Sequence, residues 1–296
     1  MSIHSGSRRL VSIWHRYRRW WLDEGVEVDL TFAFAYLMIS YPVARATMSD
    51  LFEILHEDTD LLILNKPAGL VCHPTKGDEY SSLAGRIRLY LGADCTVHLI
   101  NRLDRETSGV VVVGKTNEAA RELRQLWERR EVAKQYWAVV HGHVQQGEGA
   151  IEEPLGADES SEIAVKDCVR ADGHPSQTFF WTQWRFERTE GQFTWLRVTP
   201  VTGRKHQIRI HLQHIGHPIV GDKLYGLDAS LYLKFAKDEL TDEEWKRLIL
   251  KNQALHAHSV RFDWRDRGWE FTAEPADELV DFIETVNEEE EEHYND

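Results

Sequence analysis

The stretch NRLDRETSG, residues 101–109, contains a carboxylate, Asp104, between two guanidinium groups, Arg102 and Arg105. Flanking arginines favour the ionised form of a carboxylate. An ionised and fixed carboxylate can attack a sugar carbon or remove a proton, so the stretch is a candidate reaction centre. An aspartate ahead of Thr-Ser-Gly is, however, more often part of a turn or a cap. These residues alone leave both interpretations open.

A second polar cluster lies at residues 199–214, TPVTGRKHQIRIHLQH, which contain three basic residues, three histidines and no acid. In a chain with a net charge of -14, such a local concentration indicates a surface that faces an anion. A solvated strand face with its charges outward would give the same pattern. A third, smaller cluster is Asn65-Lys66-Pro67. All three clusters lie beside apolar runs that are typical of strands.

Other kinds of site receive little support from the sequence. The histidine pairs at 141/143 and 256/258 have no obvious carboxylate or cysteine nearby to complete a metal site. Phosphate-loop spacing and a G-x-S-x-G motif do not occur, which argues against nucleotide-dependent enzymes and serine hydrolases. We therefore expect neither a metal nor a cofactor. The cysteines are odd in number and lack C-x-x-C spacing, which indicates a reducing, cytoplasmic setting; they are Cys72, Cys95 and Cys168.

The elements that must position these clusters are predicted to be mainly strands. The run GVVVVGK (109–115) predicts a strand buried on both faces, and a helix follows it with Thr116 or Asn117 as its N-cap. The segment RKHQIRIHLQH (204–214) alternates apolar and polar residues, which predicts a strand with Arg209 on its polar face. Further predicted elements are a hairpin at 52–67, a strand at 134–142, a long hairpin at 176–203 that turns at Glu190-Gly191, a strand at 254–264, and a strand and short helix within 269–286.

These elements predict an α+β domain with a large, mostly antiparallel mixed sheet and few helices. Residues 277–296 hold ten acids and no Lys or Arg, and we expect a solvated acidic tail there. The catalytic domain is expected at 48–276. Residues 1–47 are an N-terminal extension, either an element packed on the domain or sequence upstream of a start at Met48. Its apolar stretch, 30–44, is shorter than the roughly 20 residues of a membrane span and follows an acidic stretch, unlike a signal peptide.

Five motifs, in this order along the chain, resemble those of the RluA family of RNA pseudouridine synthases. NKPAGLVCH (65–73) resembles the first motif of the family, and NRLDRETSG (101–109) resembles the motif that carries the catalytic aspartate. The next three motifs of the family are similar to KQYWAVVHG (134–142), TGRKHQIRIHLQHIGHPIVGDKLYG (202–226) and LHAHSVRF (255–262). Each motif alone is weak, whereas their joint occurrence is highly specific.

The resemblance implies the pseudouridine synthase fold and the conversion of uridine to pseudouridine in structured ribosomal or transfer RNA, by a monomer without a cofactor. Asp104 would be the catalytic carboxylate, either attacking the target uridine or abstracting the sugar proton that leads to a glycal. Tyr136 would lie against the uracil ring and help remove the C5 proton, and Arg209 would pair with Asp104. The implied substrate-binding residues are Arg102, which would fill the gap left by a flipped uridine, and Lys66, Arg204, Lys205, His206 and Leu255.

Two departures from the family pattern and two other functions stay open. The family usually has His at the position of Asn101, so we expect altered support of the loop, and residues 1–50 contain no recognisable S4 RNA-binding domain. One alternative is an RNA-binding or RNA-folding factor whose catalysis is secondary or lost. The other is a carboxylate-dependent glycosidase, which needs a second acid about 5–9 Å from the first. No acid beside the motifs stands out for that role.

Overall fold

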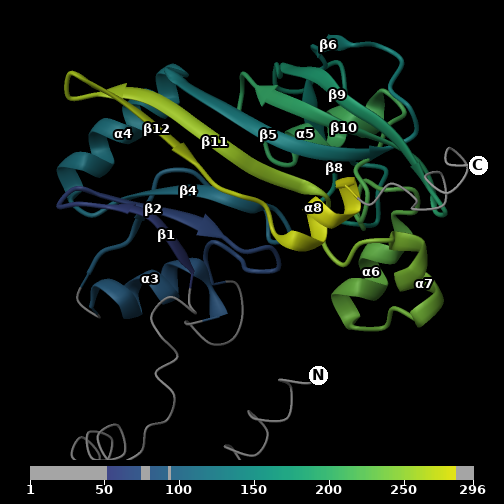
Figure 1. Cartoon of the computed structure of the whole chain (residues 1–296), viewed down its shortest axis with the longest axis horizontal. Coiled ribbons are helices and arrows are strands. Elements are labelled where there is room, and N and C mark those ends of the chain that lie inside the picture. The colour runs from purple at the N-terminus through teal and green to yellow at the C-terminus, as the bar shows by residue number, and fades with distance from the viewer. Residues whose placement is uncertain (1–51, 75–80, 93–94, 285–296) are drawn as a thin grey trace, which may run out of the picture. The chain divides into compact units, whose positions relative to one another are not determined.

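The computed structural model describes residues 52–74, 81–92 and 95–284 (Figure 1). The chain divides into two compact units, residues 1–48 and 49–296, and the first unit lies outside the described residues. The predictions for residues 1–47 and for the EEEEE run near the C-terminus also lie outside them. The fold is therefore that of the second unit.

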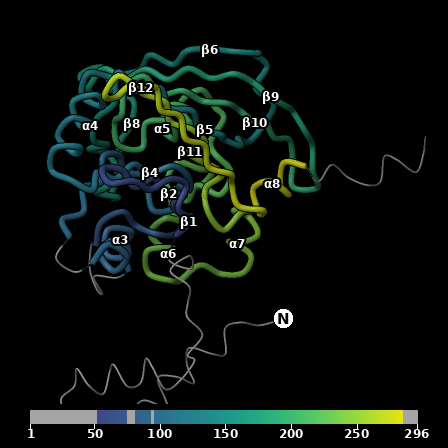
Figure 2. The backbone as a smooth tube through the Cα atoms, turned by 60° about the vertical axis from the view of Figure 1, so that its left-hand side comes forward, coloured from purple at the N-terminus to yellow at the C-terminus, as the bar shows by residue number. Residues whose placement is uncertain are grey.

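A ten-stranded mixed sheet forms the centre of this unit, with strands in the order β1–β2–β4–β11–β5–β10–β9–β6 (Figures 1 and 2). Strand β12 pairs with β11, and β3 pairs with β4. Among the described strands, every pairing is antiparallel except that of β4 with β11. This confirms the predicted α+β class. The strands of this sheet are β1 Glu53–Glu57, β2 Leu61–Lys66, β3 His98–Leu99, β4 Ser108–Gly114, β5 Val132–His141, β6 Glu148–Ile151, β9 Thr178–Arg188, β10 Gly191–Pro200, β11 Leu255–Trp264 and β12 Arg267–Thr272.

Strand β4 lies in the middle of one half of the sheet, and its four consecutive valines point alternately to the two faces of the sheet. Val111 and Val113 share a buried cluster with helix α3 (Leu83–Leu91), and the two even-numbered valines share another with α4 (Asn117–Arg129). Successive side chains of a strand point to opposite faces, so both faces of β4 are covered. The predicted burial on both faces is confirmed, because all four valines are at most 2% exposed.

Helix α4 begins and ends at recognisable local signals. Thr116 Oγ1 accepts a hydrogen bond from the backbone N–H of Ala119 at 3.2 Å, so Thr116 is the N-cap. The helix ends at Arg130, whose left-handed backbone (φ 62°) lets its N–H donate to the carbonyls of Leu126 and Trp127. Such a left-handed end satisfies carbonyls that have no partner within the helix. The chain then passes directly into β5.

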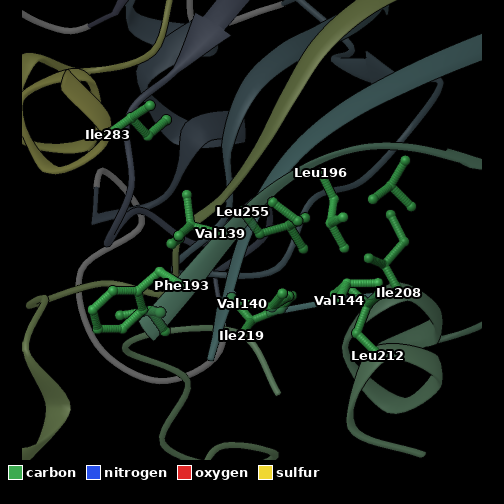
Figure 3. Close-up of a cluster of buried hydrophobic side chains, with 14 of the residues drawn as sticks. Val139, Val140, Val144, Phe193, Leu196, Ile208, Leu212, Ile219, Leu255 and Ile283 are labelled. Atoms are coloured by element: carbon green, nitrogen blue, oxygen red, sulfur yellow. The ribbon is translucent and has the colours of Figure 1, made fainter. Parts of the chain in front are cut away.

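The other half of the sheet covers the largest buried cluster, part of which is drawn in Figure 3. Val139 and Val140 of β5 and Leu196 of β10 meet side chains from helices α5 (Gln207–His214) and α8 (Asp277–Glu284). The predicted hairpin is confirmed as β9 and β10, although Gly191 already belongs to β10 and the turn lies at Thr189-Glu190. This half therefore provides a rigid base for α5.

The prediction of a strand at 204–214 is wrong, because residues 207–214 form helix α5. Ile208 and Leu212, four residues apart, face the large cluster in Figure 3, while Ile210 faces a separate cluster with Leu224 and Tyr225. A short helix that is apolar on two opposite sides shows the same alternation as a strand, and period alone does not separate them. Arg209 is therefore buried between two clusters and does not lie on a polar strand face.

Three short helices and a small sheet complete the unit beyond what the sequence predicts. Helix α3 covers one side of β2 and β4, whereas α6 (Ser230–Lys237) and α7 (Asp242–Leu248) follow each other after α5 and lie together in Figure 1. Strands β7 (Leu155–Ala157) and β8 (Asp167–Val169) pair only with each other. None of the described helices is long and apolar enough to cross a membrane.

Helix α8 changes the expected start of the acidic tail. Its residues Leu279, Phe282 and Ile283 are buried in the large cluster, although charge alone assigns residues 277–296 to a solvated segment. The acids of α8 lie on a helix whose other side is apolar, and that side packs on the sheet. Residues 277–284 therefore belong to the folded domain.

Candidate active site

Asp104 and Arg209 meet directly, although 105 positions separate them in the sequence. Arg209 Nη1 donates to Asp104 Oδ2 at 2.8 Å. Asp104 lies in the turn before β4, where the N–H of Thr107 donates to its carbonyl at 3.2 Å, and Arg209 lies in the first turn of α5. The side chain of Asp104 is 30% exposed, whereas that of Arg209 is 8% exposed. The pairing of Arg209 with Asp104 that the sequence predicts is present.

A second carboxylate, Asp222, holds the other side of the Arg209 guanidinium. Arg209 donates to Asp222 through Nε at 2.6 Å and through Nη2 at 2.8 Å. Asp222 Oδ1 also accepts the backbone N–H groups of Leu224 and Tyr225 at 2.9 Å. Burial alone would raise the pKa of Asp222, but Arg209 and these N–H groups lower it. Burial also works against the Arg209 charge, yet the two carboxylates raise its pKa.

Asp222 is a functional candidate that the sequence analysis missed. It is the only acid in the segment 202–226, which contains four basic residues. An isolated acid in a basic segment that leads to a buried site is a signal for a paired carboxylate. The two flanking arginines were expected to hold Asp104 instead, and no interaction of theirs with it is found among the described residues. Arg105 turns away and donates through Nε to the carbonyl of Gly69 at 3.2 Å.

His206 lies on the other side of Asp104. Its Nε2 is 3.9 Å from Asp104 Oδ1, and its Nδ1 is 2.9 Å from the hydroxyl of Tyr225. That hydroxyl accepts the backbone N–H of Asp167 at 2.9 Å, so the Tyr225 proton is free to be donated to His206. Burial lowers the pKa of His206 even though Asp104 opposes this effect. A neutral imidazole next to Asp104 can exchange a proton or bind a polar group of a ligand.

The loop that carries Asp104 is fixed to its surroundings by two side chains. Asn101 donates through Nδ2 to the carbonyl of Val110 at 3.0 Å and accepts the N–H of Val112 through Oδ1 at 2.8 Å. The Asn101 amide therefore continues the hydrogen-bonding pattern of β4 as another strand would. Asn101 thus supports the loop directly; whether this differs from the support that the family His gives stays a prediction. Cys72 Sγ lies 3.4 Å from both the N and the O of Leu103 and fixes the residue just before Asp104.

Lys66 stabilises the same loop and presents no exposed surface for the predicted contact with substrate. It is 0% exposed, and its ammonium donates to the carbonyls of Pro67, Leu70 and Arg105 at 2.8, 2.8 and 3.2 Å. Each of the three N–H groups of the ammonium has a carbonyl acceptor, so none is left to donate to a ligand. Burial lowers the pKa of Lys66 to about 8. Lys66 therefore connects the loop after β2 to the Asp104 loop.

Tyr136 is half-buried and touches both the cluster beneath α3 and the large cluster of Figure 3. Burial and, to a smaller extent, the charge of Asp104 raise its pKa. Its hydroxyl is therefore neutral near pH 7, and Asp104 is close enough to contribute to this shift. A neutral aromatic ring next to a carboxylate suits packing against a flat ligand.

The remaining predicted residues differ in exposure. Arg102, Arg204 and Lys205 are exposed, and Lys205 forms an ion pair with Asp167 at 2.8 Å. Arg102 and the side chain of Arg204 have no hydrogen bond or ion pair among the described residues. Leu255 is 4% exposed and lies in the large cluster, where Figure 3 shows it beside Val139. Its predicted contact with substrate is therefore not supported, because a buried core residue presents no surface.

A further network next to Asp104 was not predicted. Lys223, directly after Asp222, pairs with Glu106 at 2.8 Å and also donates to the carbonyls of Gly221 and Lys251. Its ammonium lies over the rings of Phe235 in α6 and Trp245 in α7, at 4.8 and 5.4 Å from their centres. Burial lowers the pKa of Lys223 and raises that of Glu106, and the pairing opposes both effects. The α6–α7 segment is thereby joined to both loops of the site.

The described residues contain no group of three or more His, Cys, Asp or Glu side chains that could hold a metal ion. The two histidine pairs have other partners, because His256 lies 2.9 Å from both Ser108 Oγ and the Ala273 carbonyl, and His143 bonds to the Phe186 carbonyl. The polar side chains of the site thus comprise a half-exposed carboxylate, a buried guanidinium, a second carboxylate, an imidazole and a phenol. Such a set can hold one carboxylate ionised and accessible.

Comparisons with known proteins agree with these observations. Residues 60–214 match the family model described as RNA pseudouridylate synthase. The ribosomal large subunit pseudouridine synthase C of Haemophilus ducreyi is 36% identical over 71% of this chain and 61% of its own length. The dual-specificity RNA pseudouridine synthase RluA of Vibrio parahaemolyticus is 38% identical over 60% of this chain and 70% of its own length. The chain thus spans about three fifths of the first of these relatives.

Two solved human structures have the same fold. Human RNA pseudouridylate synthase domain containing 1 superposes with a TM-score of 0.61 at 24% identity, over 76% of this chain and 83% of that chain. Human RNA pseudouridylate synthase domain containing 4 gives a TM-score of 0.58 at 24% identity, over 77% of this chain and 90% of that chain. The predicted fold is confirmed by these similarities.

Proposed function

The chain belongs to the RNA pseudouridylate synthase family, within its RluA-type members, and on that premise we propose that it isomerises uridine to pseudouridine in structured RNA. The observation that carries the proposal is the Asp104–Arg209–Asp222 arrangement. Asp222 fixes the guanidinium from the buried side, and Arg209 fixes one oxygen of Asp104. The rest of Asp104 stays accessible at 30% exposure. A carboxylate held in this way is fixed in orientation and accessible to a sugar.

The reaction rearranges bonds within one nucleotide. The N1–C1′ bond breaks, the uracil rotates, and a C5–C1′ bond forms; C5 then loses a proton and N1 gains one. Asp104 begins this sequence in one of two ways. It attacks C1′ as N1 leaves and is displaced when C5 bonds to C1′, or it removes the C2′ proton as N1 leaves and returns that proton to C2′ when C5 bonds to C1′. Deuterium at C2′ distinguishes these routes, because it slows only the second.

The other site residues have roles around the uracil and ribose. The neutral ring of Tyr136 packs against the uracil, and its hydroxyl stands near the proton that leaves C5. A uridine inside a stem is inaccessible to a recessed carboxylate, so it must leave its stack. Arg102, exposed and without a described partner, fills the space that the uridine vacates. His206 faces the oxygen of Asp104 that Arg209 does not hold.

The substrate is structured RNA, either ribosomal or transfer RNA. The name of one relative refers to the ribosomal large subunit, which supports ribosomal RNA, and the name of the other refers to dual specificity, which agrees with more than one kind of RNA. Arg204 is exposed beside the site and contacts the RNA backbone. We place the protein in the cytoplasm, acting as a monomer, because one chain supplies every group named here.

The test is a map of pseudouridines in total RNA by carbodiimide labelling. Cells that lack the protein are complemented with wild type, Asp104→Asn or Asp266→Asn. We expect one or more sites to disappear in the deletion, to return with wild type, and to stay absent with Asp104→Asn. Asp266→Asn is the matched control, because Asp266 lies in the exposed turn between β11 and β12 with a left-handed backbone that Asn also adopts.

Two results would contradict the proposal. One is a map in which no site depends on the protein. The other is full restoration of every site by Asp104→Asn, which would favour an RNA-binding factor without catalysis. A glycosidase is disfavoured because Asp222, the acid that shares Arg209 with Asp104, is 0% exposed and has both oxygens occupied.

A further inference from the structure

A hollow of about 320 Å³ lies where α4 passes into β5, beside the segment that joins β10 to α5. Three cationic side chains line it: Arg130 at the end of α4, Lys134 in β5, and Arg204 before α5. Glu128 is the only acid among the described residues that line it. Gly203 is at its edge, where an added Cβ would meet no atom within 4 Å.

The three cations have no ion pair among the described residues, although the chain has an excess of acids. Some surface cations elsewhere are paired, as Arg170 is with Asp172 and Lys115 with Glu57, and others such as Arg102 are not; Lys134 differs from these because it is partly buried. Lys134 is only partly exposed, and burial together with the charge of Arg130 lowers its pKa. A partly buried charge that lacks an acidic partner costs folding free energy. Such groups tend to occur where a ligand supplies the missing charge.

A hydrogen-bond donor in the wall of the hollow is also unsatisfied. Trp127 Nε1 is buried and finds no acceptor among the described residues. Buried donors almost always have a partner, so each exception requires an explanation. Because Nε1 is itself closed to solvent, the groups that an anion in the hollow would meet are the three cations.

The hollow is built from residues that lie close in the sequence to residues of the Asp104 site. Lys134 and Tyr136 are two residues apart in β5, so they share one face of the strand and lie about 7 Å apart along it. Arg204 precedes His206 by two residues. Strands β10 and β5 are antiparallel with Val198 opposite Tyr136, so the residues after Val198 run beside those before Tyr136.

From this placement we propose that the hollow binds a backbone phosphate of the substrate RNA, close to the uridine on which Asp104 acts. The inference rests on the proposed function and adds Arg130 and Lys134 to the groups that contact RNA. A phosphodiester carries one negative charge and accepts hydrogen bonds, which suits the three unpaired cations of the hollow. Two sides of the same bound strand would thus be held, the base by Tyr136 and the backbone by the hollow.

The test compares the full chain with Lys134→Met and Arg130→Gln. The probe is an unmodified in vitro transcript of large-subunit ribosomal RNA, used for binding and for pseudouridine formation. Each variant should lower affinity about five- to eightfold at 0.1 M salt and reduce the slope of log affinity against log salt by about 0.7–0.9. At saturating RNA, kcat should stay within about twofold of wild type, because a phosphate contact positions the RNA without taking part in bond making.

Two controls separate binding from folding. Arg121→Gln, in an exposed position of α4, and Lys237→Met, at the end of α6, remove the same charges outside the hollow and should leave affinity and slope unchanged. Lys134→Met should leave the melting temperature unchanged or raise it, because it removes a partly buried charge without an acidic partner. A structural role for Lys134 would lower the melting temperature instead.

Three results would overturn the inference. The first is unchanged RNA affinity and salt slope in both variants. The second is a gain in RNA affinity, which would indicate that the acidic C-terminal residues occupy the hollow. The third is stabilisation of wild type alone by inorganic phosphate with RNA affinity unchanged, which would indicate a site for a free anion. Failure of wild type to form pseudouridine would contradict the proposed function by itself, while the binding comparison would still decide the hollow.

Discussion

At the scale of single residues, two carboxylates share one guanidinium, and their exposure assigns them different tasks. The side chain of Asp222 is 0% exposed, and its two oxygens accept hydrogen bonds from Arg209 and from two backbone N–H groups. Asp104 spends one oxygen on Arg209 and keeps an accessible side. The buried acid therefore balances the arginine charge and fixes its orientation, and the accessible acid can react. Positioning of this kind matters because a displacement of about 1 Å can cost about 100-fold in rate.

The first prediction concerns Asp222 as a positioning residue. In Asp222→Asn, Arg209 keeps its charge but loses its ionic partner on the buried side, so we expect kcat to fall about 100-fold with little change in KM. The free energy of unfolding should also fall by about 3–5 kcal/mol, because breaking a buried pair leaves a charge uncompensated. Steady-state kinetics at a temperature where the variant is folded, together with urea unfolding, measure both effects.

The control for this substitution is Asp228→Asn, which removes the negative charge of a partly exposed partner of Arg247. It should cost less than about 1 kcal/mol and leave kcat unchanged. An Asp222→Asn variant with the kinetics of wild type would show that Arg209 needs no second carboxylate.

The second prediction is a loss of stability in acid that depends on His256. Burial lowers the pKa of His256 from 6.5 to about 4, and the imidazole bonds to Ser108 and to the Ala273 carbonyl. Because the unfolded chain takes up the proton first as pH falls, this contribution to stability is complete above about pH 6.5 and is lost toward pH 4. The stability lost in this way between pH 7 and pH 4 is about 3 kcal/mol.

The measurement is urea unfolding of wild type and His256→Asn at pH 7 and pH 4. The wild type should lose about 3 kcal/mol more than the variant between these two pH values. Equal losses would mean that His256 takes up its proton as readily in the folded protein as in the unfolded chain, which would contradict the prediction.

At the scale of secondary-structure elements, the site is built from segments that begin or end at the sheet. The Asp104 loop leads into β4, Tyr136 lies within β5, and Arg209 opens α5 after the hairpin of β9 and β10. Helices α6 and α7 reach this group through Lys223, which contacts Phe235 and Trp245. The α6–α7 segment is therefore anchored to the site through one buried ammonium group.

The third prediction tests that anchor with a double-mutant cycle. Lys223→Met or Glu106→Gln alone should lower the free energy of unfolding by about 3–5 kcal/mol, since each leaves the other charge buried and unpaired. The double variant should be more stable than the sum of the two losses predicts, with a coupling of about 0.5–3 kcal/mol. Urea unfolding of the four proteins gives the coupling, and additive losses would show that the pair does not interact.

The sequence predicts the strands of this fold better than it predicts α5. The valines of β4 and the cap of α4 are local signals, and local signals survive in the structure. In contrast, Ile208, Ile210 and Leu212 look like one strand face because α5 is buried on two opposite sides. The elements that surround a short apolar segment are determined by the tertiary structure, and the periodicity of a single sequence does not reveal them.

The same distinction applies to the site. Asp104 and Arg209 lie in motifs that resemble those of the family, so their pairing could be predicted without knowledge of the fold. The burial of Lys66 could not, because an Asn-Lys-Pro segment gives no indication that three carbonyls surround the ammonium. Nor could the hollow beside Lys134, which brings together residues 130, 134 and 204 from separate segments.

At the scale of the whole domain, the site lies where the two halves of the sheet meet. We name this junction the seam and define it by the pairing of β11 with β4, His256 opposite Ser108 and Ala257 opposite Gly109. One half contributes Asp104 and the other contributes Arg209. Tyr136 touches the buried clusters of both halves. The relative position of the halves therefore sets the distance between Asp104 and Arg209.

The fourth prediction concerns the close approach of the two backbones at the seam. Gly109 has φ +114°, and an added Cβ would lie 2.2 Å from the Ala257 carbonyl oxygen. Gly109→Ala should therefore cost roughly 2–6 kcal/mol from backbone strain and overpacking. Gly147→Ala, where an added Cβ would meet nothing within 4 Å, is the matched control and should change stability by less than about 1 kcal/mol. Thermal unfolding compares them, and equal melting temperatures would contradict the prediction.

The seam also has a consequence for how this protein can be altered by directed evolution. A library that varies the outer strands β1 and β6 changes each half within itself, and the geometry between Asp104 and Arg209 is retained. A library that varies the residues around Gly109 and Ala257 shifts one half against the other, and most of its members lose the reaction whatever their stability. Tolerance to mutation should therefore be lowest along a narrow line through the middle of the sheet, and recombination of halves from different relatives should succeed only when that line is inherited intact.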